Sequence, residues 1–101
     1  MKLSAQPLAN PAAIYRDGLD GWAVLVNLDT AGSLALNPTG VAVWGLVDGR
    51  RTVQEITAAV ARSFRDAPPT VADDVTALLD TLAAEGFIGL EWTPGDMKRE
   101  T

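Results

Sequence analysis

Cysteine and histidine are both absent from this chain of 101 residues. Without cysteine it has no disulfide, no thiolate nucleophile, no iron–sulfur ligand and no cysteine zinc site. Without histidine it has no Ser-His-Asp triad and no imidazole metal ligand. Because only carboxylates, lysine, tyrosine and hydroxyl groups remain as reagents, we expect a binding protein that uses no cofactor and no metal, and not an enzyme.

Long hydrophobic runs are absent as well. No window approaches the roughly 18 consecutive apolar residues of a transmembrane helix, because charged residues interrupt every apolar stretch. Residues 1–11 contain one lysine and two prolines but no apolar run of signal-peptide length. We therefore expect a cytoplasmic protein without a membrane partner.

Positive charge is scarce, with eight lysine and arginine residues against 13 aspartate and glutamate residues and a net charge of −5. Affinity for nucleic acids depends largely on neutralising phosphate groups, so this balance argues against a nucleic-acid partner. It favours a peptide or another protein.

The composition that is present is ordinary for a globular protein, with 48% apolar and 21% charged residues. A chain of this length forms one domain that buries roughly two-thirds of its unfolded surface. Residues 1–11 show no apolar period and are interrupted by proline, which predicts a flexible N-terminal arm. Residues 93–101 predict a flexible C-terminal tail, so the folded domain is expected over residues 12–92.

Three short segments in the first half have strand character. Residues 13–16 and 22–28 are rich in β-formers and flank a turn sequence at 17–21, which predicts a hairpin. Residues 33–36 then alternate small or polar with large apolar side chains after a second turn at 29–32. We predict a three-stranded antiparallel meander.

Two helices are predicted from their first residues. Asn37-Pro38 is a good helix start, because asparagine caps with its side-chain oxygen and proline at the first position has no amide to leave unpaired. Thr52 and Glu55 have the spacing of a capping box, and apolar residues follow at helical intervals.

A third helix follows the break at residues 66–69. Thr70 and Asp73 repeat the spacing of a cap, an apolar stripe runs from Val71 to Leu82, and Gly86 is suited to a left-handed cap at the end. The fold class is therefore α+β: a three-stranded antiparallel sheet followed by three helices.

Several short motifs in this order resemble those of a known family. They are Leu36-Asn37 with Thr39-Gly40 and Trp44, then Asp48-Gly49, Thr52-Val53 with Glu55-Ile56, Asp74-Val75 leading to Leu82, and Gly86-Phe87-Ile88. From about Ala13 to Ile88 the chain resembles the PqqD-like proteins, the recognition elements that bind leader peptides of ribosomally synthesised and modified peptides. The double proline Pro68-Pro69 and the polar tail depart from the family pattern.

The resemblance implies a small winged-helix-like domain with no catalysis of its own. It implies that the leader of a precursor peptide adds as a strand beside the third strand, in a groove also walled by the third helix. It further implies a tailoring enzyme as second partner, often a radical S-adenosylmethionine enzyme.

The residues support this site in one respect. In a meander, residues 33–36 form an edge strand, and the segment 31–36 has neither the lysine nor the proline that usually protects an edge. Such an edge can accept a guest strand. The predicted peptide-binding residues are Ser33, Leu34, Ala35 and Leu36 on the strand, and Asp74, Ala77, Leu78 and Thr81 on the face of the third helix turned away from its core stripe.

Four alternatives remain open at this point. The edge also suits a scaffold that bridges enzyme subunits, or the pairing of two copies in a homodimer. A winged helix can bind DNA, but the expected recognition helix has no lysine or arginine and would repel phosphate. An enzyme would have to use carboxylates such as Asp73 and Asp74, which point in different directions on a helix.

Overall fold

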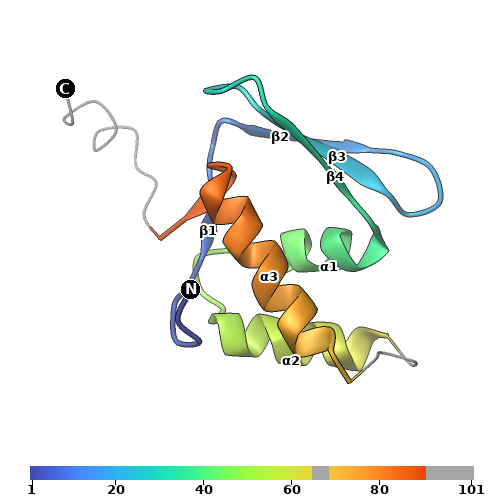
Figure 1. Cartoon of the computed structure of the whole chain (residues 1–101), viewed down its shortest axis with the longest axis vertical. Coiled ribbons are helices and arrows are strands. Elements are labelled where there is room, and N and C mark those ends of the chain that lie inside the picture. The colour runs from blue at the N-terminus through green and yellow to red at the C-terminus, as the bar shows by residue number, and fades with distance from the viewer. Residues whose placement is uncertain (65–68, 91–101) are drawn as a thin grey trace.

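The computed structural model describes residues 1–64 and 69–90. Its main sheet has the antiparallel order β2 (Ala13–Asp17), β3 (Ala23–Asn27) and β4 (Ser33–Leu36). The predicted meander is confirmed, with β4 at one edge (Figure 1).

Both hairpin turns use backbone conformations that few residues adopt readily. Between β2 and β3, Asp20 and Gly21 have φ values of 57° and 83°, and the Gly18 N–H donates to the Trp22 carbonyl at 2.8 Å. Between β3 and β4, Ala31 has φ 64°. Aspartate and glycine tolerate positive φ, which is why residues 17–21 turn where the sequence predicted.

Two helices begin where the sequence predicted. The first is α1 (Pro38–Leu46), where the Asn37 side chain accepts from the Gly40 N–H at 2.8 Å. The second is α2 (Val53–Ser63), where Thr52 accepts from the Glu55 N–H at 3.1 Å and Glu55 accepts from the Thr52 N–H at 2.8 Å. The capping box is therefore confirmed.

The cap predicted for the third helix, α3 (Val71–Ala84), is wrong. Thr70 makes no side-chain hydrogen bond to the backbone of the first turn, because its φ and ψ of −87° and 6° are not the extended conformation that directs a capping oxygen to those amides. Its hydroxyl lies instead 3.5 Å from a carboxylate oxygen of Asp74. The other end matches the prediction, with Gly86 at φ 78° after the helix.

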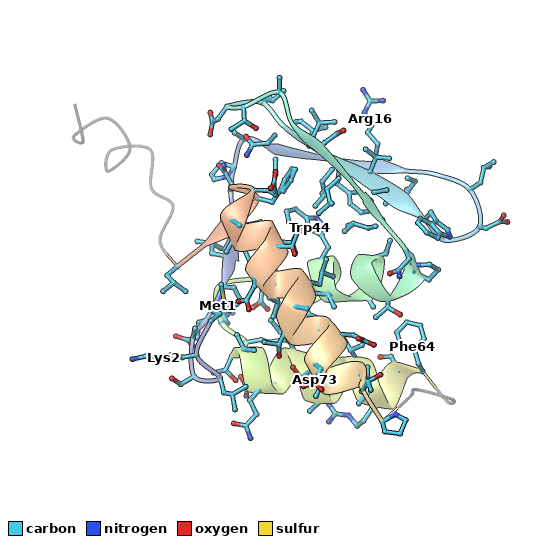
Figure 2. All side chains as sticks on the ribbon, viewed as in Figure 1. Met1, Lys2, Arg16, Trp44, Phe64 and Asp73 are labelled. Carbon is cyan, nitrogen blue, oxygen red and sulfur yellow. The ribbon has the colours of Figure 1, made fainter. Side chains whose placement is uncertain are left out.

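The core lies between the inner face of the sheet and the three helices (Figure 1). Arg16 points away from the helices on the other face (Figure 2). Trp44 is partly buried and packs against the core. The buried apolar residues are Ala23, Leu25, Leu36, Val43, Val47, Val53, Ile56, Val60, Val75, Leu79, Leu82, Phe87 and Ile88.

A second, two-stranded sheet was not predicted. It pairs β1 (Leu8–Ala9) antiparallel with β5 (Ile88–Gly89), so regular structure begins before Ala12, where the sequence predicted its start. The buried Asn10 side chain donates to the Gly86 carbonyl at 2.9 Å. These contacts hold Leu8, Ala9 and Asn10 in place. The flexibility predicted for the arm of residues 1–11 stays a prediction.

The remaining boundary predictions fall outside the described residues. These include most of the break at residues 66–69 and the tail over residues 93–101. None of the helices within residues 1–64 and 69–90 combines the length and the hydrophobicity that a membrane span requires.

Candidate functional site

Among residues 1–64 and 69–90, no strand pairs with the outer edge of β4. The direction of the backbone groups on this open edge follows from the hydrogen-bond register. The Asn27 N–H donates to the Gly32 carbonyl at 2.8 Å, which makes these two residues a hydrogen-bonded pair. Such pairs alternate along an antiparallel ladder, so Leu34 bonds to β3 whereas its neighbours do not. The N–H and C=O groups of Ser33 and Ala35 therefore point away from β3, toward the open edge.

Side chains of β4 alternate in the same way. Leu36 is buried and Leu34 is half-buried, both on the face that looks toward the helices, while Ser33 and Ala35 are exposed on the opposite face. This is the orientation that the period-two pattern predicted. A strand paired with β4 would thus alternate its own side chains between the helix side and the outer face.

The opposite edge of the sheet, β2, is better occupied. The Ala13 N–H donates to the Asn10 carbonyl at 2.9 Å, which removes one edge donor. Further along β2, Tyr15 and Asp17 interact through their side chains. Their hydrogen bond, then desolvation and then the negative charge of Asp17 raise the pKa of Tyr15. The edge at β4 is therefore the more accessible of the two for a guest strand.

An apolar hollow of about 150 Å³ lies at the end of β4. Ala35 and Leu36 form one side, Leu78 of α3 another, and half-exposed Trp22 a third. Its remaining lining residues are Asn37 and Gly40. The hollow is large enough for a single apolar side chain.

A second hollow, of about 330 Å³, continues from the first and shares Asn37, Gly40 and Leu78 with it. The other residues that line it are Thr39, Asp74, Val75 and Ala77. The two hollows together form a groove that starts beside the β4 edge and runs between α1 and α3. We call it the β4–α3 groove.

The first turn of α1 separates β4 from α3 at the base of the groove. Gly40 is buried there, and a Cβ added to it would lie 3.2 Å from both Cβ and Cδ2 of Leu36. Glycine therefore lets α1 approach the strand closely. Asn37, which caps this helix, is exposed beside it.

The structure brings together five of the eight residues predicted for the site. Ala35, Leu36, Asp74, Ala77 and Leu78 line the groove. Ser33 contributes edge backbone, whereas Leu34 and the exposed Thr81 line neither hollow. Peptide contact by these residues stays a prediction.

Five lining residues were missed. They are Trp22, assigned to a strand, Asn37, assigned to a helix cap, Thr39 and Gly40, noted only as part of a family motif, and Val75, assigned to the apolar stripe. One signal was present in the sequence, since the helix start at Asn37-Pro38 follows the edge strand directly and must lie at its end.

The groove has a negative character and no obvious chemistry. Asp74 is the one ionisable residue among those that line the two hollows. Within residues 1–64 and 69–90, no group of three or more carboxylates is arranged to hold a metal ion. The arrangement is suited to holding an extended chain.

Comparison with solved structures finds a similar fold in TbiB1, solved in complex with the TbiA(beta) leader peptide. The TM-score is 0.68 at 23% sequence identity, and the match covers 85% of this chain and 99% of that one. No curated protein matches the sequence. The family model for coenzyme PQQ synthesis protein D (PqqD) matches residues 23–88, which include β3, β4, the three helices and every lining residue of the β4–α3 groove except Trp22. The chain therefore belongs to the PqqD family.

Proposed function

We propose that this protein binds the leader segment of a ribosomally synthesised precursor peptide by strand addition to β4 and presents it to a tailoring enzyme. The observation that carries the proposal is the outward direction of the Ser33 and Ala35 backbone groups, directly beside the β4–α3 groove. The PqqD family and the leader-peptide complex of TbiB1 support the same function.

Backbone pairing would supply affinity without sequence preference. Each hydrogen bond to the edge contributes on the order of 0.5–1.5 kcal/mol net, because it replaces a bond to water. Guest residues opposite Leu34 and Leu36 would point to the same side of the sheet as these leucines, toward α3. Sequence preference would therefore come from the side chains that enter the groove.

The second partner in this proposal is a peptide-modifying enzyme of the radical S-adenosylmethionine type. The protein itself contributes position and not chemistry. Two copies paired through their β4 edges would cover the same backbone groups, so a homodimer of that kind and a peptide complex exclude each other.

Substitution Ala35→Pro tests the edge directly. Proline removes the outward N–H of residue 35 without removing a hydrogen bond to β3. With about 1 kcal/mol lost, affinity for the leader of the cognate precursor peptide should fall about fivefold or more. Isothermal titration calorimetry measures this affinity, and the thermal unfolding midpoint checks that the fold persists.

Asp17→Pro is the matched control, because Asp17 lies on the opposite edge strand and its N–H also points away from β3. Leader affinity should stay within about twofold of the parent protein, since surface changes away from a site have small effects. Equal affinity of Ala35→Pro and the parent, or an equal loss in both variants, would contradict strand addition at β4.

A further inference from the structure

The second hollow of the groove lies where a strand paired with β4 would arrive if it continued past Leu36. Asn37, Thr39 and Gly40 follow β4 in the chain and line this hollow, and the N-terminal half of α3 supplies its other wall. A guest chain that places one side chain in the apolar hollow can therefore place a second one here, on the same face and two residues away.

The charge of this hollow is one-sided. Asp74 is its ionisable residue, and α3 carries Asp73 and Asp80 but no lysine or arginine. In the described part of the chain, Asp80 pairs with the N-terminal amine and Asp48 pairs with Arg51. Asp74 instead contacts the Thr70 hydroxyl at 3.5 Å. The positive end of the helix dipole compensates part of the Asp74 charge, equivalent to roughly half an elementary charge.

The shape of the hollow suits a long side chain with a charged end. Val75, Ala77 and Leu78 provide apolar surface on the α3 side, and the Asp74 carboxylate lies on the same helix one turn before Leu78. Lysine and arginine bury their aliphatic stems against such surface and keep the charged group at the polar end. A glutamate in the same place would be repelled by the part of the Asp74 charge that the helix dipole leaves uncompensated.

We infer that Asp74 makes the β4–α3 groove selective for leader peptides with a lysine or arginine two residues from a bulky apolar residue. This inference rests on the proposed function and adds the chemical class of its ligand. The apolar residue occupies the hollow beside Trp22 and Leu36, and the basic residue extends toward Asp74.

The order of the two residues depends on strand direction. β4 runs from Ser33 to Leu36, toward the Asp74 hollow. A guest antiparallel to β4 would enter at the Asp74 end, so its basic residue would precede the apolar one. A parallel guest would carry them in the reverse order.

Selection from a phage-displayed library of random dodecapeptides tests the inference and does not require the natural leader to be identified first. The bait is the full chain, and peptides are retained for sequencing if Ala35→Pro weakens their binding. The parent protein should enrich lysine or arginine at one position two residues from a bulky apolar residue. Asp74→Asn should lose that enrichment, and Asp74→Lys should select aspartate or glutamate there.

Asp73→Asn is the matched control. It removes a carboxylate from the same helical turn as Asp74, but Asp73 does not line the groove. It should select the same peptides as the parent. For one selected peptide, lysine to glutamine should weaken binding to the parent about three- to fivefold, in the upper range of exposed ion pairs. On Asp74→Asn the same change should have almost no effect.

The outcomes separate the two proposals. Two results would overturn the charge selectivity and leave strand addition intact. In the first, peptides whose binding is weakened by Ala35→Pro show no enriched basic residue. In the second, replacing the peptide's lysine by glutamine weakens binding to the parent and to Asp74→Asn by the same factor. If the selection yields no Ala35-dependent peptide, the proposed function itself fails, and the selectivity fails with it.

Discussion

Position 86 shows how a single residue joins the end of α3 to the sheet. Gly86 has φ 78°, and a Cβ built on it would lie 2.9 Å from Nδ2 of Asn27. That amide belongs to a buried side chain that donates to the Glu85 carbonyl at 3.0 Å and accepts from the Asp29 N–H at 2.9 Å. The glycine is thus required both by its backbone conformation and by the asparagine beside it.

Gly86→Ala should destabilise the protein by about 1–2 kcal/mol from backbone strain alone, with the contact to Asn27 adding to the loss. Asn27→Ala should cost about 1–3 kcal/mol, because it removes a buried side chain and leaves the partly buried backbone groups of Asp29 and Glu85 without their partners. Urea unfolding of each variant measures both losses.

The double variant should be less destabilised than the sum of the two, because removing the asparagine amide relieves the contact with the new methyl group. Strict additivity would show that the two residues do not interact in the way the geometry indicates.

Among the elements, α2 and α3 differ in how their first turns are closed. The α2 cap is reciprocal between Thr52 and Glu55, whereas Thr70 before α3 makes no cap bond. The same residue type in a comparable sequence pattern therefore has two different structural roles.

Thr52→Ala should lower the free energy of unfolding by about 1 kcal/mol, the usual cost of losing a cap. Thr70→Ala serves as the matched comparison and should change it by less than about 0.5 kcal/mol, as surface substitutions usually do. Chemical unfolding at one temperature compares them, and an equal loss in the two variants would contradict the assigned caps.

Local patterns account for most elements of this fold. The strand over residues 33–36 was predicted with the bounds that the structure shows, and the Asn37 and Thr52 caps marked two helix starts. These features depend on neighbours within a few residues, which the sequence displays directly. The pairing of β1 with β5 could not be predicted, because it joins two-residue segments from opposite ends of the chain that carry no period of their own.

The candidate site could be predicted in part for the same reason. Ala35, Asp74 and Leu78 were found from strand alternation and helix periodicity, which assign residues to faces. Gly40 reaches the groove only because α1 folds back between β4 and α3. Trp22 reaches it because the strand register pairs its neighbour Ala23 with Leu36. That placement depends on tertiary packing, which no local pattern encodes.

For the whole molecule, the net charge of −5 bears on the alternative that a winged helix binds DNA. Without lysine or arginine on α3, entry of that helix into a groove of DNA would bring carboxylates toward phosphates. The protein should not retard a DNA duplex in a gel-shift assay even at about 50 mM salt, where electrostatic binding is strong. A shifted band that weakens as salt is raised would restore the DNA hypothesis.

Leu78 lines both hollows of the β4–α3 groove. A substitution at this position would therefore alter both contacts inferred for the leader at once, because a new side chain there reshapes the apolar hollow and the surroundings of Asp74 together. A relative with a different residue here would need matched changes in two residues of its cognate leader, whereas a change at Asp74 would need only one.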